Sequence, residues 1–458
     1  MTHSLRFDAL RSAYRTGVLT PVEVVDQVLR TIAARGEDHV WAFVADAEAL
    51  RQRARTLAAR MHEIDRLPLF GLPFGVKDNV DVAGSPTACG CPTYSRTPEL
   101  SSQAVQKALD AGAIFIGKQT LDQFATGLNG TRTLGGHCRN VFDADYIPGG
   151  SSSGSGVAVA AGLVSFSLGS DTGGSGRIPA AMNNIVGVRP SIGRVSTKGM
   201  VYNNRLFDCI PIFASTVEEA YVVLDVISGA DSDEPVRPWG PGAGTRNAPA
   251  DGMFHFAIPN QLEFFGDTTS AECFAQAVAR LKGLGGSCVE IDLASYHEAG
   301  RMIFESGLVA ERVASYGDVL HASPQQLVPT VAAILMRARK YTAVDAFNAM
   351  YRLAELQSEF ARQFQNIDVL VTPTLPRPYT VREMLEEPLV RNAEIGYYTY
   401  GVGPLDLCAV AVPSALRPDG LPFGVSIIGR SGSDDLLRDL GRRFEAATGI
   451  PPGVAALR

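Results

Sequence analysis

The sequence predicts an α/β protein with a central β-sheet that is covered by helices on both faces. Segments with helical periodicity alternate with short apolar, β-rich segments along the chain, which suggests a mostly parallel sheet. Hydrophobic residues make up 46% of the 458 residues and charged residues 19%, as expected of a protein with a large buried core. No repeat and no second independent core is visible, so we expect a single domain over residues 1–458.

Helix-start signals and apolar spacing define the predicted elements. Thr20, Pro21 and Glu23 form a capping box with proline at the first helical position, and Gly36 marks the helix end. The N-terminal helices, up to about residue 65, are expected to pack on the core. Further helices are predicted at 45–65, 101–109, 121–126, 216–227, 271–284, 296–315, 344–364 and 434–448, and strands or extended segments at 40–44, 69–79, 113–116, 254–258, 287–291, 368–371 and 423–428. The segment 231–250, rich in Pro, Gly and charge, is predicted to be a surface excursion or lobe boundary.

Charge and cysteine usage favour a cytoplasmic protein without a nucleic-acid or membrane partner. The net charge is −7 and the 41 basic residues are dispersed, so nothing predicts a nucleic-acid or membrane partner. The N-terminus has no basic and apolar pattern of a signal peptide, and no window is apolar and long enough to span a bilayer. The seven cysteines have no zinc spacing, so we expect reduced thiols and no bound metal.

The stretch from Ile147 to Pro179 carries the strongest functional signal. Two clusters of glycine and serine flank an apolar segment long enough for a helix, or for a helix followed by a short strand. Glycines at this density let the main chain approach a ligand closely, and the serines offer hydroxyl groups for chemistry. A flexible linker would not enclose such an apolar segment.

Several chemistries fit serines in this setting. Residues 150–154 match the Gly-x-Ser-x-Gly elbow of α/β-hydrolases with Ser152 at its centre, but the preceding segment is a poor strand and no histidine stands in a recognisable setting. The glycine spacing of phosphate-binding loops is absent. Without a histidine, the base could be a second serine or a desolvated lysine, and Lys77 ends an apolar segment. Lys77 could equally be a solvent-facing residue at a strand end.

Three separated blocks resemble the amidase signature family: residues 75–79, 148–155 and 171–180. The resemblance implies a mixed sheet and amide hydrolysis through an acyl-enzyme, without metal or cofactor. It implies that Ser175 is the nucleophile and that Ser151, in a cis peptide, passes the proton to Lys77. The backbone amides of Thr172, Gly173, Gly174 and Ser175 would form the oxyanion hole, and Ser152, Asp171 and Arg177 would support the loop.

Within that family, segments 121–127, 183–187, 309–312 and 417–425 are most similar to allophanate hydrolases. Arg312 matches an arginine that binds the substrate carboxylate there. The pocket departs from those enzymes at Phe304, which replaces a tyrosine, at Tyr400 in an altered segment, and at Asn129. We therefore expect a small linear urea derivative as substrate, with allophanate first, guanylurea second and biuret or another small amide as alternatives. Less favoured are a non-catalytic binding protein and a glutamine-hydrolysing transamidosome subunit. The resemblance also suggests a homodimer.

Overall fold

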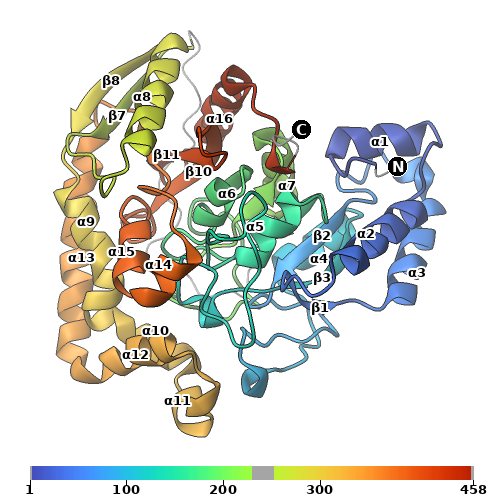
Figure 1. Cartoon of the computed structure of the whole chain (residues 1–458), viewed down its shortest axis with the longest axis horizontal. Helices are drawn as coiled ribbons and strands as arrows, with labels where there is room; N and C mark the ends of the chain where they lie inside the picture. Colours follow the sequence, from blue (N-terminus) through green and yellow to red (C-terminus); the bar gives the residue numbers. More distant parts are fainter. Residues whose placement is uncertain (1–2, 230–251, 455–458) are drawn as a thin grey trace.

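The computed structural model describes residues 3–229 and 252–454, and the strands in these ranges form one eleven-stranded sheet (Figure 1). In spatial order the strands are β1 (Trp41–Val44), β3 (Ile114–Gln119), β2 (Pro73–Lys77), β4 (Phe166–Leu168), β6 (Ile212–Ala214), β5 (Val186–Arg189), β10 (Leu407–Leu416), β11 (Pro422–Arg430), β9 (Val369–Pro373), β7 (Phe254–Pro259) and β8 (Gly286–Ile291).

The sheet is mixed, so the expectation of a mostly parallel sheet is wrong. Strand β2 is parallel to β3 and β4, and β7 is parallel to β8 and β9. The remaining pairs between described strands are antiparallel. The physical reason lies in the centre of the sheet, where β10 and β11 form a hairpin across a short turn that contains Asp419 and Gly420.

The α-helices of the described ranges are α1 (Phe7–Arg15), α2 (Pro21–Arg35), α3 (Ala47–Ala58), α4 (Gln103–Asp110), α5 (Ser153–Ala160), α6 (Ile178–Met182), α7 (Val217–Ile227), α8 (Thr268–Gly283), α9 (Ala294–Glu305), α10 (Ala310–Tyr316), α11 (Val319–Ala322), α12 (Pro329–Arg337), α13 (Ala343–Gln363), α14 (Val381–Glu386), α15 (Val390–Ile395) and α16 (Asp434–Thr448). Figure 1 shows α1–α3 beside the β1 end of the sheet and α8 beside the β7–β8 end.

Helices cover both faces of the sheet. A Cβ on Gly187 of β5 would lie 2.8 Å from Ala180 of α6, so this side of β5 faces α6. The next residue, Val188, points to the opposite face because side chains alternate along a strand. Its neighbour Val410 on β10 would contact a Cβ on Gly441 of α16 at 3.5 Å. Helices α6 and α16 therefore lie on opposite faces, as the sequence predicts for the fold class.

Most predicted elements are present with shifted ends. The Thr20 side chain caps α2 by accepting from the Glu23 amide, as predicted. The predicted helix at 434–448 is α16, and α3 ends at Ala58 rather than at 65. The N-terminal helices pack on the core: Leu10 is fully buried, and the Tyr14 hydroxyl donates to the Gly71 carbonyl at 2.9 Å. The predicted excursion at 231–250 lies outside the described residues.

Two helix predictions are wrong for identifiable reasons. The segment 121–126 forms only a single 3-10 turn, because Phe124 and Ala125 adopt positive φ angles of 51° and 54°. The segment 296–315 breaks between α9 and α10 at Gly307, whose added Cβ would lie 2.5 Å from the Ala346 amide of α13. Close contact with a distant helix thus overrides the local helical pattern.

Candidate active site

Lys77, Ser151 and Ser175 come together from three separate segments of the chain. Lys77 is the last residue of β2, Ser151 lies in the turn before α5, and Ser175 lies in the turn before α6. Lys77 Nζ lies 2.7 Å from Ser151 Oγ, and Ser151 Oγ donates to Ser175 Oγ at 2.8 Å. The Gly150–Ser151 peptide bond is cis. The three residues, which are 74 and 24 positions apart in the sequence, form one hydrogen-bonded chain.

The surroundings of Lys77 favour its neutral form. Its side chain is fully buried, and this burial lowers the pKa of Lys77 to about 7, against the opposing effect of the carboxylates of Asp122, Asp208 and Asp171. No carboxylate within the described ranges forms an ion pair with Lys77, whose hydrogen bonds go to Ser151 and Ser170. Near neutral pH a large fraction of Lys77 is therefore an amine with a free lone pair.

Ser170 offers Lys77 two further hydrogen-bond acceptors. Lys77 Nζ lies 2.8 Å from Ser170 Oγ and 3.4 Å from the Ser170 carbonyl oxygen. Asn79 Nδ2 donates to the same Oγ at 3.2 Å and to the Val201 carbonyl at 3.0 Å. A neutral amine has two N–H groups and one lone pair. If both N–H groups bind the two Ser170 acceptors, the lone pair faces Ser151.

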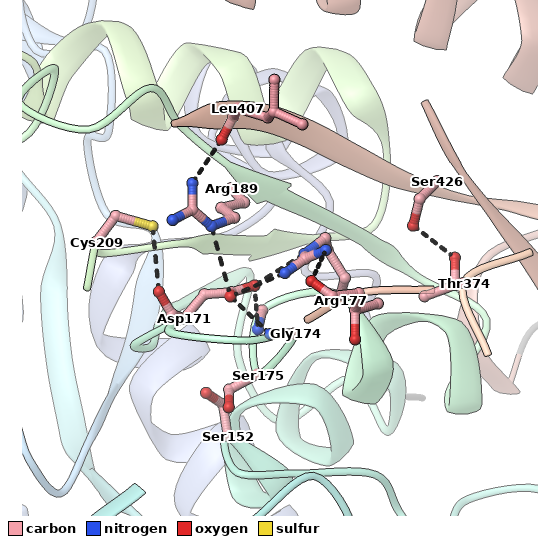
Figure 2. Close-up of polar contacts among 12 residues, drawn as sticks. Ser152, Asp171, Gly174, Ser175, Arg177, Arg189, Cys209, Thr374, Leu407 and Ser426 are labelled. Atoms are coloured by element: carbon pink, nitrogen blue, oxygen red, sulfur yellow. Dashed lines mark hydrogen bonds and ion pairs between the residues drawn. The ribbon is translucent and has the colours of Figure 1, made fainter. Parts of the chain in front are cut away.

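The loop between Ser170 and Arg177 is held by a buried cluster of charges (Figure 2). The Asp171 carboxylate accepts from the Gly174 and Gly176 amides at 2.8 and 2.9 Å and pairs with Arg177 at 3.0 Å and with Arg189 at 3.6 Å. Burial opposes ionisation here, but the two guanidinium groups and the amide donors lower the pKa of Asp171 to about 2. The loop therefore keeps one shape around a permanently ionised carboxylate.

Three of the four predicted oxyanion amides are available. The N–H groups of Thr172, Gly173 and Ser175 have no hydrogen-bond partner among the described residues, whereas that of Gly174 donates to Asp171. Gly173 lies against the Tyr400 ring, where an added Cβ would be 2.6 Å from Cδ1. Unpaired amides beside a serine hydroxyl are the arrangement that stabilises an oxyanion.

Ser152 has a different setting from Ser151. Its Oγ donates to the Ser170 carbonyl at 3.1 Å, and it immediately precedes α5. The segment before it contains no strand, so the strand–turn–helix geometry of an α/β-hydrolase elbow is absent at this position of the described chain.

Ser175 lies on the wall of a small cavity. The cavity is lined by Ala125, Thr126, Gly127, Leu128, Thr172, Gly173, Ser175, Asn203, Ile303, Phe304, Arg312 and Tyr400.

Arg312 is a buried cation without a carboxylate partner in the described chain. Its side chain is 1% exposed, its Nη1 donates to the Ile303 carbonyl at 2.8 Å, and its guanidinium lies 4.9 Å from the centre of the Phe304 ring. Burial lowers the pKa of Arg312, but an arginine remains charged at neutral pH. An unpaired buried charge is costly, so this wall of the cavity favours an anionic group.

The other residues predicted to contact substrate take two different positions. Phe304 and Tyr400 both line the cavity, with their rings 5.1 Å apart, and the Tyr400 hydroxyl accepts from Asn392 Nδ2 at 2.8 Å. Asn129 is fully buried and does not line the cavity: its Nδ2 donates to Asn392 Oδ1 at 2.8 Å and its Oδ1 accepts from Thr131.

Sequence reasoning missed Ser170, Asn79 and Asn203. Ser170 and Asn79 lie within or beside the matching blocks, so their positions next to Asp171 and Lys77 were a usable signal. Asn203 lies in an irregular segment between β5 and β6, and nothing in its surroundings marks it as part of a site. No group of three or more His, Cys, Asp or Glu side chains within the described ranges is arranged to hold a metal.

The fold and the site define the class: an α/β protein in which a buried Lys–Ser–Ser hydrogen-bonded chain lies beside unpaired loop amides. Comparison with known proteins agrees. The model of the Amidase family matches residues 23–437, and the chain belongs to this family.

Individual relatives are similar over most of this chain. Urea amidolyase of Saccharomyces cerevisiae is 37% identical over 411 residues, which cover 89% of this chain but 22% of the relative. A glutamyl-tRNA(Gln) amidotransferase subunit of Bacillus thuringiensis is 30% identical, with 94% of each chain covered. The solved structure of an alanine variant of Kluyveromyces lactis allophanate hydrolase matches with a TM-score of 0.93 and 34% identity, covering 100% of this chain and 75% of that one. The chain thus spans about a quarter or less of the urea amidolyases that it matches.

Proposed function

We propose that this protein hydrolyses an amide C–N bond of a small linear urea derivative that carries a carboxylate, with allophanate as the first candidate. The observation that carries the proposal is the Lys77–Ser151–Ser175 chain, which opens onto a cavity that also contains the unpaired cation Arg312. The likeness to urea amidolyase and to allophanate hydrolase supports it. No metal or cofactor is assigned a role.

In the proposed mechanism Ser175 Oγ attacks the carbamoyl carbon of the substrate. The Ser151 hydroxyl first turns from Ser175 Oγ toward Lys77 Nζ. The Ser175 proton then passes to Ser151 Oγ, and the Ser151 proton passes to the lone pair of neutral Lys77. The loop amides stabilise the oxyanion of the tetrahedral intermediate. When this intermediate collapses, the relay returns the proton to the leaving nitrogen, and ammonia departs. Water then attacks the acyl-enzyme by the same relay and regenerates Ser175.

The charge of the cavity ranks the substrates. The Arg312 guanidinium attracts the carboxylate of allophanate, whereas it repels guanylurea when that compound is protonated. Biuret is neutral, so its attraction to the Arg312 guanidinium is intermediate between those of allophanate and protonated guanylurea. Glutamine is retained as a further compound because a glutamyl-tRNA(Gln) amidotransferase subunit is among the relatives.

The test is ammonia release from allophanate, guanylurea, biuret, glutamine and simple amides at equal concentration. We expect the highest kcat/KM for allophanate. A higher value for guanylurea would contradict the assigned role of Arg312, and a higher value for glutamine would favour a transamidosome subunit.

The assembly and location of the protein are further proposals. We propose a homodimer because Val344, Phe347 and Tyr351 expose 67%, 57% and 65% of their surface on one face of α13. The continuous sheet supports a single amidase domain over residues 1–458. Within the described ranges, no helix has the length and apolar character needed to cross a membrane. We propose a cytoplasmic location on the sequence composition. Light scattering of the purified protein tests the dimer, and a monomer at micromolar concentration would contradict it.

A further inference from the structure

Asn203 lies at the wall of the cavity, in the connection between β5 and β6. Its side chain is only 2% exposed, and it lines the same cavity as Ser175 and Arg312. Its backbone amide donates to the Asp208 carboxylate at 2.7 Å, and the other Asp208 oxygen accepts from the Thr172 hydroxyl. Asn203 is therefore fixed relative to the loop that precedes Ser175.

The orientation of the Asn203 amide is determined by its partners. Nδ2 donates to the Phe124 carbonyl at 3.0 Å and to Thr126 Oγ1 at 2.9 Å. Because a backbone carbonyl can only accept, the NH₂ end must face Phe124, and the oxygen must point the other way. Oδ1 has no hydrogen-bond partner within the described part of the chain, and it is not among the fully enclosed polar atoms. Since Asn203 itself lines the cavity, this oxygen is directed toward it.

Arg312, which lines the same cavity, presents hydrogen-bond donors where Asn203 presents an acceptor. Its Nη1 donates to the Ile303 carbonyl, while Nη2 has no partner in the described chain and is not fully enclosed. Tyr316 lies beside both residues: its hydroxyl is 3.5 Å from Asn203 Nδ2 and interacts electrostatically with the Arg312 guanidinium. One end of the cavity thus combines a charged N–H donor with a neutral oxygen acceptor.

We propose that Asn203 is a specificity residue that accepts a hydrogen bond from a substrate N–H located next to the carboxylate bound by Arg312. The inference rests on the proposed function and deepens it, because it names the required chemical group. A substrate with an N–H between its two carbonyl carbons satisfies both residues. A substrate with a methylene at this position leaves Oδ1 buried and unpaired.

Allophanate and malonamate provide the test, since malonamate has a CH₂ in place of the central N–H of allophanate and keeps the carboxylate and the terminal amide. We compare kcat/KM for both compounds in the wild-type protein and in Asn203→Leu. The change in the ratio between proteins cancels the different intrinsic reactivities of the compounds. We expect the allophanate-to-malonamate ratio to fall roughly five- to tenfold in Asn203→Leu, as for the loss of one hydrogen bond. An unchanged ratio would overturn the inference.

Asn140→Leu is the matched control. Asn140 is another buried asparagine whose Nδ2 donates to two carbonyls, of Ile147 and Met182, but it does not line the cavity. Its substitution should leave the ratio unchanged even if it lowers stability. An equal fall of the ratio in both variants would indicate general loosening of the fold and would also overturn the inference.

A binding measurement decides the matter if Asn203→Leu does not fold. In Ser175→Ala, which retains Asn203, allophanate should bind at least about fivefold more tightly than malonamate by calorimetry. Equal affinity would overturn the role of Asn203 and leave the proposed function standing. If the wild-type protein hydrolyses neither compound and Ser175→Ala binds neither, the proposed substrate class fails and the inference fails with it.

Discussion

Replacing the buried Lys77 by methionine should abolish activity and stabilise the protein. The fall in the Lys77 pKa from 10.5 to about 7 corresponds to about 5 kcal/mol against folding at low pH, at about 1.36 kcal/mol per pKa unit. Methionine has a similar length and carries no charge. It loses the hydrogen bonds to Ser151 and Ser170, at about 1 kcal/mol each. We expect a net gain of about 2 kcal/mol in the free energy of unfolding at pH 7.

The dependence of this gain on pH is the diagnostic feature. The folded-state pKa of Lys77 lies below its unfolded value, so its destabilising effect is fully present below pH 7 and disappears as the pH rises toward 10.5. The advantage of Lys77→Met should therefore shrink by about 2 kcal/mol between pH 7 and pH 9. Urea unfolding of both proteins at the two pH values measures it. A difference in stability that does not change with pH would refute the neutral, buried lysine.

Lys118→Met is the matched control. Lys118 is also fully buried, but it forms an ion pair with Asp78 at 3.4 Å. Its removal leaves that buried carboxylate without its partner, so the same substitution should destabilise the protein by about 3 kcal/mol. We therefore expect Lys77→Met to raise the free energy of unfolding and Lys118→Met to lower it. Equal destabilisation would mean that Lys77 is also stabilised as a charged group.

The geometry of the site leads to three further predictions. The rate kcat/KM should rise with pH through an acid limb near pH 7, because Lys77 must lose its proton to act as a base; a flat profile from pH 5 to 8 would contradict this. Ser170→Ala should lower kcat about tenfold and move the acid limb to lower pH, because the Ser170 hydroxyl accepts a hydrogen bond from Lys77 and stabilises the charged form of that lysine. Ser170→Thr keeps a hydroxyl, so its kcat and its acid limb should stay close to those of the wild type. Arg312→Gln should raise KM for allophanate about a hundredfold and change that for neutral biuret far less, as measured by ammonia release; equal effects would contradict the carboxylate contact.

The sequence was sufficient to predict elements that are marked by local signals such as a helix cap or regular apolar spacing. The capping box at Thr20 and the apolar spacing before Gly36 predicted α2, and α16 was predicted with its observed bounds. Strands β5, β6 and β10 were not predicted, because they are short or alanine-rich and their pairing depends on distant partners. Strand β10 pairs with β5 through Ala409 and Arg189, which are far apart in the sequence.

The residues of the site also fall into those that the sequence predicted and those whose contacts depend on the fold. Lys77, Ser151 and Ser175 stand in blocks whose order and spacing were visible, and the structure brings their side chains together. The predicted substrate contact of Asn129 rests on sequence position alone. Its amide partner Asn392 is 263 residues away and could not be anticipated. Asn203 was missed for the same reason, since its bond to Thr126 exists only in the fold.

Ammonia release from allophanate by the wild-type protein and by Ser175→Ala tests the central claim most directly. Ser175 is 3% exposed, accepts a hydrogen bond from Ser151 and lines the cavity, so removing its hydroxyl should leave the fold intact and remove the nucleophile. We expect ammonia release by the wild-type protein and a rate at least about a thousandfold lower in the variant. Equal rates in the two folded proteins, or no ammonia from the wild type, would contradict the proposed role of Ser175.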